Sequence, residues 1–317
     1  MNAIAYAWQV GECLLAIGLA PLFAGWVGQC RAWLQSRSAP PIGQPYRVWR
    51  KLFHKDATLA LHASWLFRGA PYGVFATMVL AAAIIPSVTT DLPLTRVADA
   101  IALVGLFATA RVFMALAAMD VGTAFGSLGA RREMMIGFLT EPALLMVLFN
   151  AFLMSGTTAL PAVVQDTLTP TRFVLHPSLA FAAVAFVMVL LAENARLPID
   201  NPATHLELTM IHEAMALEYS ARHLALIEWA SSLKLFNYAC IGFALFVPWG
   251  IAVHGVTASG MALALVALLG KLLLAGAALA LFETVSAKLR LFRAPEFLTM
   301  AFLLAVLGLL VHLLLEA

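Results

Sequence analysis

Charged residues are scarce in this chain of 317 residues. It holds 19 lysine and arginine residues and 17 aspartate and glutamate residues, together 11% of the sequence, whereas 62% of the residues are hydrophobic. A soluble domain usually carries about 25% charged residues. Because so few charges cannot cover a water-facing surface, the composition excludes a soluble globular protein, a disordered chain and a basic nucleic-acid-binding domain. The remaining solvent is a lipid bilayer.

Cysteine is also rare, and the common nucleotide-binding motifs are missing. The three cysteines, Cys13, Cys30 and Cys240, lie far apart and form no CxxC motif. This spacing argues against an iron–sulfur or zinc site built from this chain alone and gives no support to a disulfide framework. Neither the GxGxxG pattern nor a P-loop occurs, and no nucleophile–base pair is readable. The sequence therefore predicts no complete active site, and it leaves open whether the chain belongs to an enzyme.

Long apolar runs are what the chain does contain. About 20 apolar residues cross the hydrocarbon core of a bilayer as a helix, and eight runs approach this length. They predict an all-α membrane protein with eight transmembrane helices in a single integral membrane domain, residues 1–317. The runs cover residues 8–30, 71–90, 98–119, 134–155, 177–193, 229–249, 260–282 and 297–315.

The basic residues are distributed unevenly between the loops that these runs leave. Fourteen lysine and arginine residues lie in one alternate set of loops, and two, Arg96 and Arg172, lie in the other set. Loops rich in lysine and arginine stay in the cytoplasm, so both termini are predicted to lie outside. The basic set consists of loops 31–70, 120–133, 194–228 and 283–296.

Several charged residues fall within the apolar runs or near their ends, where each costs about 2.5–3.5 kcal/mol on insertion scales. One interpretation is ion pairs that hold helices together. The other is proton carriage, because apolar surroundings favour the protonated form of a carboxylate. We expect ion pairing for Glu12 and Lys234 and proton carriage for Glu141, with Arg111 or Lys271 as its partner. The charged residues within the runs are Arg111, Glu141 and Lys271, and those nearer the ends are Glu12, Lys234 and Glu283.

A second carboxylate, Glu133, precedes Glu141 by eight residues. On a helix this spacing corresponds to about 80° of rotation and about 12 Å of rise. The two carboxylates therefore do not share a helix face, but both can border one interior cavity. We include Glu133 with Glu141 in a predicted proton path.

Aromatic and basic residues are interleaved between Tyr46 and Phe67. This amphipathic composition predicts a helix that lies at the cytoplasmic membrane surface. Its basic residues Arg47, Arg50 and Lys51 are candidates for docking a peripheral partner.

The densest polar chemistry follows the fifth apolar run, in residues 193–228. Pro198 and Pro202 end one helix and permit a new one, which predicts a long acidic helical loop. Clustered carboxylates repel one another, which favours the protonated form of some of them. Interleaved leucine and methionine residues indicate that much of the segment is buried rather than a solvated surface. The segment contains Glu193, Asp200, Glu207, Glu213, Glu218 and Glu228 against Arg196 and Arg222.

Two histidines of this segment, His205 and His212, are seven residues apart and so lie on one face of a predicted helix. The sequence from His212 to Ala216 begins like the zinc-peptidase HExxH pattern but ends in alanine, so we predict no zinc site. Glu207 follows Thr204 by three residues, so a helix capping box is the structural alternative for this carboxylate.

The same segment carries a family resemblance. Glu193-Asn-Ala-Arg196-Leu-Pro198-Ile-Asp200, followed by Glu207-Leu208 and Glu218-Tyr219-Ser220, resembles the loop between the fifth and sixth helices of the complex I subunit 1 family. Within that family, the whole stretch from Asp200 to Ser220 resembles membrane component C of hydrogenase-4 and formate hydrogenlyase-type complexes. Trp65-Leu-Phe-Arg68-Gly-Ala-Pro71-Tyr matches this branch too. The resemblance covers nearly the whole chain and implies the same eight spans.

The resemblance implies the membrane anchor and proton-coupling subunit of an energy-converting hydrogenase-like complex in a prokaryotic cytoplasmic (inner) membrane. Its partners would be a nickel–iron hydrogenase-like large subunit, an iron–sulfur small subunit and antiporter-like membrane subunits. Iron–sulfur clusters and a nickel–iron centre would lie on those partners, and this chain would bind no cofactor. By motif match, the resemblance assigns the loop roles to Glu193, Arg196, Asp200, Glu207 and Glu218 and the mid-membrane role to Glu141. With the residues argued above, the predicted proton path is Glu141, Glu133, Glu193, Asp200, Glu207, Glu213 and Glu218. The predicted charge partners are Arg111, Arg196, Lys234, Lys271 and Glu283, and the predicted docking residues are Arg47, Arg50, Lys51, His205 and His212.

Two alternatives remain at this point. One is a quinone-chamber subunit of a respiratory NADH dehydrogenase (complex I), in which a quinone would bind. Ala203 and His205 stand where complex I has acidic residues, which disfavours a conventional quinone site. The other is an autonomous ion transporter, which the absence of a visible internal repeat disfavours.

Overall fold

The computed structural model describes residues 3–60, 63–91, 93–94, 99–168, 177–200, 210–253, 258–287, 289 and 293–316. Within these ranges every regular element is a helix, and the β-type contacts are two isolated bridges, Thr89–Ala252 and Asp99–Ala159. The prediction of an all-α protein is therefore confirmed. The helices are α1 (Ala3–Leu34), α2 (Gln44–Phe53), α3 (Trp65–Ile84), α4 (Ala100–Asp120), α5 (Ala124–Ser155), α6 (Leu160–Thr167), α7 (Pro177–Glu193), α8 (His212–Ala216), α9 (Ala221–Phe246), α10 (Ala258–Val285) and α11 (Ala294–Val311), followed by a π-helical turn (His312–Glu316).

Six of the helices, α1, α3, α4, α5, α10 and α11, are long and apolar enough to cross a bilayer. The other two predicted spans also lie on helices: α7 is apolar but has 17 residues, and the 26-residue α9 carries Arg222, Glu228 and Lys234. The chain is therefore an integral membrane protein by the length and composition of its helices.

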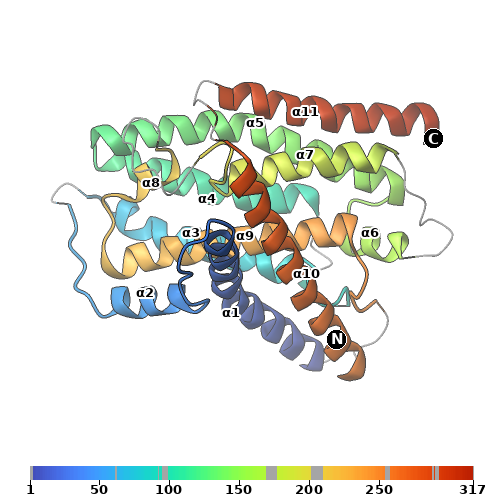
Figure 1. The fold of residues 1–317 in the computed structure, drawn as a ribbon, viewed down its shortest axis with the longest axis horizontal. Helices are drawn as coiled ribbons and strands as arrows, with labels where there is room; N and C mark the ends of the chain where they lie inside the picture. The colour runs from blue at the N-terminus through green and yellow to red at the C-terminus, as the bar shows by residue number, and fades with distance from the viewer. Residues whose placement is uncertain are drawn as a thin grey trace.

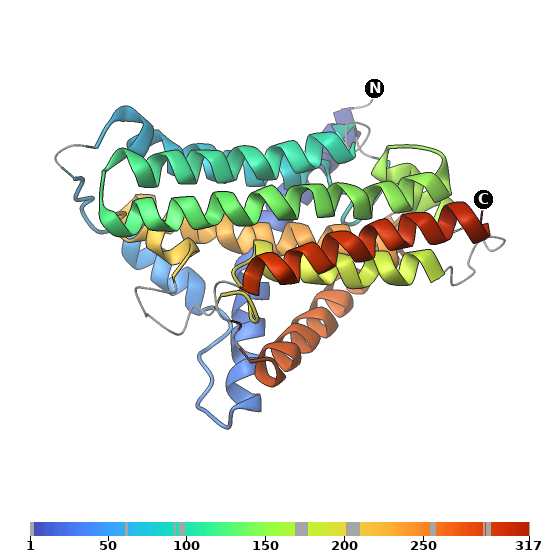
Figure 2. The ribbon, with the colours of Figure 1, turned by 90° about the horizontal axis from the view of Figure 1, so that it is seen from above.

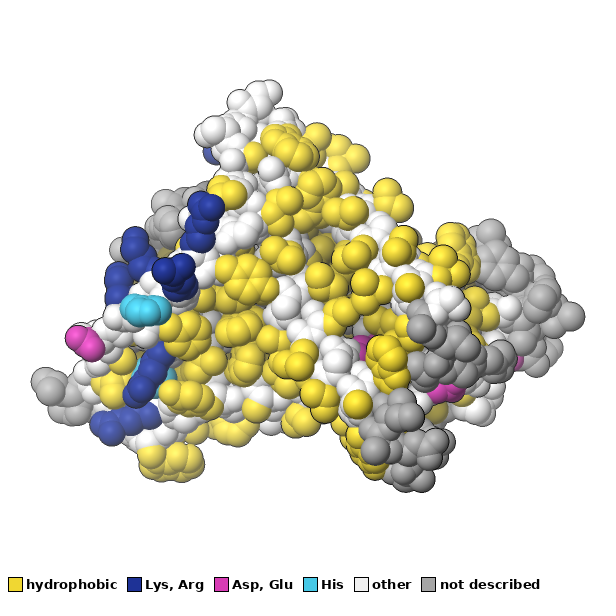
Figure 3. All heavy atoms as spheres, turned by 90° about the horizontal axis from the view of Figure 1, so that it is seen from below, with side chains coloured by type: hydrophobic (Ala, Val, Ile, Leu, Met, Phe, Trp, Pro, Cys, Tyr) yellow, Lys and Arg dark blue, Asp and Glu magenta, His cyan; other side chains and the backbone are white. Residues whose placement is uncertain are grey.

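The ends of the molecule differ in chemistry. Both termini lie at one end, and α2 and α8 lie at the other (Figure 1). On the face drawn in Figure 3, lysine and arginine side chains gather at one end and border a broad hydrophobic surface. Arg47, Arg50 and Lys51 of α2 line a shallow cleft of about 510 Å³ together with His54 and Lys55.

Helix α5 lies between α4 on one side and α7 and α11 on the other (Figure 2). Small residues permit this close packing, as is common between helices in membranes. A Cβ added at Gly308 of α11 would lie 2.9 Å from the Ser178 carbonyl oxygen of α7. Side chains on different faces of α5 therefore meet different neighbouring helices.

The amphipathic helix is shorter than predicted. It ends at Phe53, whereas Trp65 and Phe67 belong to α3, which Ser64 caps by accepting a hydrogen bond of 3.1 Å from the Leu66 amide. Trp49 is buried in the membrane-protein interior, where it stacks on Trp229 at a ring-centroid distance of 4.7 Å. The aromatic residues that suggested one long helix therefore belong to two helices.

Two of the predicted loops also differ from the structure. Residues 124–133 form the first turns of α5, because Thr123 caps this helix by accepting a hydrogen bond from the Gly126 amide. Arg131, Arg132 and Glu133 thus lie on a helix rather than in a loop. In the acidic loop, the described helix is the five-residue α8, and Glu207 and His205 lie outside the described residues.

Candidate functional site

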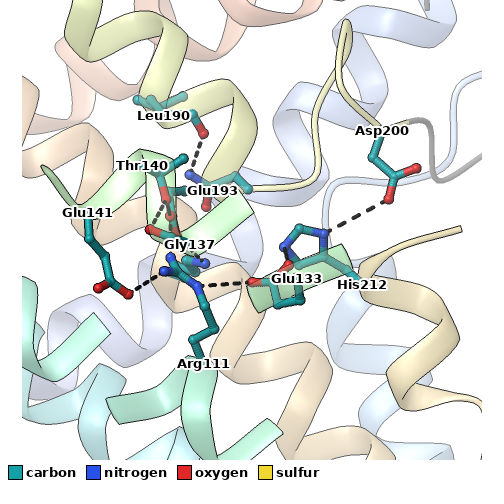
Figure 4. Close-up of polar contacts among 11 residues, drawn as sticks. Arg111, Glu133, Gly137, Thr140, Glu141, Leu190, Glu193, Asp200 and His212 are labelled. Atoms are coloured by element: carbon teal, nitrogen blue, oxygen red, sulfur yellow. Dashed lines mark hydrogen bonds and ion pairs between the residues drawn. The ribbon is translucent and has the colours of Figure 1, made fainter. Parts of the chain in front are cut away.

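One arginine of α4 gathers three carboxylates from two other helices (Figure 4). Arg111 Nε lies 3.2 Å from Glu133 Oε1 of α5. Its Nη1 pairs with Glu141 Oε1 of α5, and its Nη2 pairs with Glu193 Oε1 at the end of α7. The guanidinium carries its donors in a fixed fork, so it can serve several acceptors at once. The Arg111 side chain is 3% exposed, which makes this cluster part of the interior.

Gly137 makes room for the guanidinium. It lies midway between Glu133 and Glu141 on α5, and an added Cβ there would lie 2.7 Å from Arg111 Cδ and 2.8 Å from Arg111 Cζ. The long arginine side chain therefore reaches across α5, and both carboxylates meet it although they lie on different helix faces. The sequence analysis did not include Gly137. Its position, four residues from each of the two carboxylates, could have indicated that it belongs to the site.

Glu193 is the most fully paired carboxylate of the cluster. Lys234 Nζ of α9 lies 2.8 Å from its Oε2, and the Thr140 hydroxyl donates a hydrogen bond to its Oε1. Its side chain is 2% exposed, and a buried charge requires such partners to offset its desolvation. Lys234 thus forms an ion pair, as the sequence led us to expect.

His212 connects the Arg111 cluster to the acidic loop. Its Nε2 lies 3.1 Å from Glu133 Oε2, and its Nδ1 lies 3.9 Å from Asp200 Oδ2. We predicted a docking role for His212, but it lies between two carboxylates with a side chain that is 23% exposed. Asp200, which is buried, lies at the loop end of this series of contacts.

The position of α8 depends on Gly129 of α5. A Cβ added there would lie 2.9 Å from the Ile211 carbonyl oxygen and 2.9 Å from Ala214 Cβ. Arg132, on the next turn of α5, donates a hydrogen bond of 2.9 Å to the Met210 carbonyl. Close packing on glycine and this hydrogen bond therefore hold His212 beside Glu133.

A second ion-pair cluster ties other helix ends together. The buried carboxylate Glu283 of α10 lies 3.0 Å from Arg196 and 3.5 Å from Arg31 of α1. The Leu289 amide donates a hydrogen bond of 2.8 Å to the Pro198 carbonyl. Arg196 and Glu283, which we predicted as charge partners, therefore pair with each other and not with the Arg111 cluster.

Two other charged residues of the spans lie outside the cluster. Of the two cations considered as partners of Glu141, the structure selects Arg111, because Lys271 Nζ donates a hydrogen bond of 2.6 Å to the Val247 carbonyl. Glu12 accepts hydrogen bonds of 2.9 Å from the Ser87 amide and 2.7 Å from the Val88 amide. Glu12 thus binds the chain that follows α3 and has a structural role, but through these hydrogen bonds and not through the ion pair that we expected.

Two further carboxylates of the predicted proton path follow His212 in the chain. Glu218 is exposed, and Glu213 is partly buried on α8. Among the described ranges, no three histidine, cysteine, aspartate or glutamate side chains come close enough to hold a metal ion. The groups that the structure brings together here are carboxylates, His212 and the cations Arg111 and Lys234.

This arrangement can carry and redistribute protons. Arginine stays protonated, so Arg111 cannot relay a proton itself, but it stabilises the ionised form of whichever carboxylate it contacts. Glu133, Glu141 and Glu193 share this one guanidinium. A shift of Arg111 toward one carboxylate would leave another with a poorer partner and so favour its protonation.

Substitution of Gly137 tests how tightly this cluster is packed. Gly137→Ala should destabilise the protein by about 1–3 kcal/mol, the usual cost of overpacking a well-packed interior. Gly105→Ala and Gly270→Ala are matched controls, because nothing lies within 4 Å of a Cβ at either position and alanine favours helix. Thermal unfolding in detergent, followed by tryptophan fluorescence, should show a lower midpoint for Gly137→Ala alone. Equal midpoints in all three variants would contradict the packing argument.

Comparisons with known proteins agree with this architecture. The family model described as NADH dehydrogenase matches residues 10–314. Formate hydrogenlyase subunit 4 of Escherichia coli is 34% identical over 287 residues, which cover 90% of this chain and 91% of that protein. Hydrogenase-4 component C of Escherichia coli is 32% identical over 245 residues, which cover 77% of this chain and 76% of that protein.

A solved structure shares the fold. A chain of the membrane-bound sulfane sulfur reductase, an archaeal respiratory membrane complex, superposes with a TM-score of 0.79 over 96% of this chain and 98% of that chain, at 19% identity. The family match spans almost the entire sequence, and the resemblance identified from the acidic loop is confirmed. The chain belongs to the NADH dehydrogenase family, as a complex I subunit 1-like membrane protein.

Proposed function

We propose that this chain is the membrane anchor and proton-coupling subunit of a hydrogenase-4 or formate hydrogenlyase-type complex. The observation that carries the proposal is the buried cluster in which Glu133, Glu141 and Glu193 share Arg111. The relatives named formate hydrogenlyase subunit 4 and hydrogenase-4 component C support the type of complex. In this proposal the redox centres lie on partner subunits, a hydrogenase-like large subunit and an iron–sulfur small subunit.

The proposed path begins at the acidic loop and ends within the membrane. A proton enters at Asp200, passes to His212 and reaches Glu133, since these groups follow one another at 3.9 and 3.1 Å. Histidine suits this relay because its two ring nitrogens can take and give a proton near neutral pH. Rearrangement around Arg111 then transfers the protonated state from Glu133 to Glu141. Glu207, Glu213 and Glu218 belong to the loop that supplies the entrance.

Redox chemistry in the peripheral arm drives the path by moving the loop. Docking or reduction of the arm would shift α8 and with it His212, a local change that biases which carboxylates are paired. Lys234 Nζ lies 2.8 Å from Glu193 Oε2 and gives Glu193 a cation in addition to Arg111, so we assign the movable proton to Glu133 and Glu141. Antiporter-like membrane subunits would receive the proton or the conformational change.

The proposed topology has eight spans in one domain, with both termini outside and α2, α8 and the acidic loop in the cytoplasm. The placement of both termini at the end opposite α2 and α8 supports it (Figure 1), as does the concentration of basic residues in the α2 cleft.

Cysteine-accessibility labelling tests this topology. In a variant without native cysteines, Ala60→Cys should react with a membrane-impermeant maleimide from the cytoplasmic side, and Asp166→Cys should react from the outside. Inverted and right-side-out vesicles separate the two sides. Reaction of both positions from one side would exclude the proposed topology.

The basic cleft of α2 is the proposed docking surface for the peripheral arm. Reversing the charge at Arg47, Arg50 and Lys51 should release the arm from purified membranes, because electrostatic complementarity steers and orients such contacts. A matched control reverses Arg37, Arg68 and Arg131, which are exposed and lie outside the cleft. Co-purification of the hydrogenase-like subunits measures the effect. Equal retention of the arm in both triple variants would assign docking to another surface.

A further inference from the structure

Tyr238 of α9 lies beside the Arg111 cluster, although the proposed proton path does not use it. It follows Lys234 by four residues, so the two side chains share one face of α9, and it is 1% exposed. The charged groups that act on its hydroxyl are, in decreasing order, Glu193, Arg111, Glu141 and Glu133. The phenol of Tyr238 therefore borders the interior region in which these four groups meet.

Two phenylalanine rings hold the ring of Tyr238 in place. Phe107 of α4 stacks on it at a ring-centroid distance of 4.8 Å, and Phe186 of α7 lies at 6.3 Å. Both phenylalanines are buried. Phe107 lies one turn before Arg111 on α4, and Phe186 lies two turns before Glu193 on α7. The tyrosine is thus fixed against the two helices that carry these charges, and its hydroxyl does not follow the guanidinium when Arg111 moves.

Glu193 is the carboxylate for which a fixed donor matters most. It now contacts Arg111, Lys234 and Thr140. When Arg111 turns toward another carboxylate, Glu193 loses one of its two cations, and a buried carboxylate with fewer partners takes up a proton more readily. Without a replacement for the guanidinium, Glu193 would compete for the proton that the proposed path delivers to Glu141.

We propose that Tyr238 is a positioning residue of the proton site, whose hydroxyl donates a hydrogen bond to Glu193 when Arg111 turns to another carboxylate. This inference deepens the proposed function and rests on it. A phenol suits the task because it donates a hydrogen bond and keeps its own proton at neutral pH. With this donor, Glu193 stays ionised throughout the cycle, and the movable proton is confined to the other two carboxylates.

Tyr238→Phe tests the hydroxyl, because it keeps the ring and its stacking. In the whole complex reconstituted in vesicles, electron transfer should continue. The ratio of translocated protons to transferred electrons should fall as the pH is lowered, and this fall should begin about one pH unit higher than in the unmodified complex. The sign follows from the lost donor, since Glu193 then takes up a proton at higher pH. The size follows from a hydrogen bond to a charged group, which changes an equilibrium constant by about tenfold or more.

Two further variants separate the hydroxyl from its packing. 4-Fluorophenylalanine in place of Tyr238 fills the space of the hydroxyl without donating a hydrogen bond. It should shift the pH profile in the same way, and it decides the test if Tyr238→Phe does not assemble. Tyr219→Phe is the matched control, because Tyr219 is also buried but donates its hydrogen bond of 3.0 Å to the Phe67 carbonyl. Its pH profile should equal that of the unmodified complex.

Infrared difference spectra between the reduced and oxidised complex identify the carboxylate that takes the proton. We expect a C=O band of a protonated carboxyl group in Tyr238→Phe that is missing from the unmodified complex and from Tyr238→Phe/Glu193→Gln. An unchanged pH profile, the lack of this band or its persistence in the double variant would each overturn the inference and leave Tyr238 with a packing role. If the band behaves as expected but Glu141→Gln still translocates protons, the proposed function fails and Tyr238 remains the donor to Glu193.

Discussion

Replacement of Glu141 by glutamine should abolish proton translocation and leave assembly of the complex intact. Glutamine keeps the volume of the side chain, and its carbonyl can still accept a hydrogen bond from Arg111, which Glu141 Oε1 contacts now. It cannot take up or release a proton, however. Electron transfer to an artificial acceptor should therefore continue, because the redox arm is unchanged. Proton uptake into inverted vesicles, measured with a fluorescent pH probe during turnover, should disappear.

A matched control separates this role from a general loss of charge. Glu296→Gln removes a carboxylate of α11 that is exposed at the surface and lies outside the proposed path, so it should leave proton uptake close to that of the unmodified complex. Glu133→Gln interrupts the path nearer its entrance and should also stop uptake. Proton uptake at an unchanged ratio to electron transfer in Glu141→Gln would reduce Glu141 to a structural partner of Arg111.

The membrane helices could be predicted from the sequence because hydropathy is a local property. Each predicted span overlaps a helix, although the span predicted over 71–90 passes the end of α3 at Ile84, and the composition alone excluded a soluble fold. The start of α5 was missed because Arg131, Arg132 and Glu133 lower the local hydropathy, although the helix continues through them from Ala124. Hydropathy indicates which residues can lie in the hydrocarbon core, whereas the first residue of α5 depends on the cap at Thr123.

The functional cluster was predictable only in part. The cost of a charge in a membrane singled out Arg111 and Glu141, and this argument applies to each residue separately. The sequence analysis grouped Glu133 with Glu141 from their spacing, but their contact with one arginine depends on Gly137, which lets the guanidinium cross α5. The spacing of Gly137 from the two carboxylates does not by itself show that a side chain of another helix lies there. The sequence analysis placed His212 among the docking residues. Its position beside Glu133 depends on the contact between α8 and Gly129.

Substitution of Arg111 should cause the largest loss of stability of any single change in the chain. Removing one partner of a buried ion pair typically costs 3–5 kcal/mol, because it leaves a charge buried without compensation. Arg111→Met keeps much of the side-chain volume but leaves Glu133 and Glu141 without their cation, whereas Glu193 retains Lys234. We expect a strong decrease in membrane-inserted protein and in its unfolding midpoint in detergent. Arg37→Met, at an exposed arginine, is the control and should have no such effect.

Second substitutions that restore part of the stability of Arg111→Met show which carboxylate depends most on Arg111. Glu133→Gln should restore stability in the double variant more than Glu193→Gln does, because Glu133 is 4% exposed and would retain only His212, whereas Glu193 keeps its lysine. Arg111→Lys should fall between the arginine and methionine proteins, since one ammonium cannot reproduce the fork of donors that contacts three carboxylates. Equal rescue by both glutamine substitutions would mean that Lys234 does not hold Glu193 independently of Arg111. The cluster would then titrate as a single unit, and no separate proton could pass from Glu133 to Glu141 while Glu193 stays ionised.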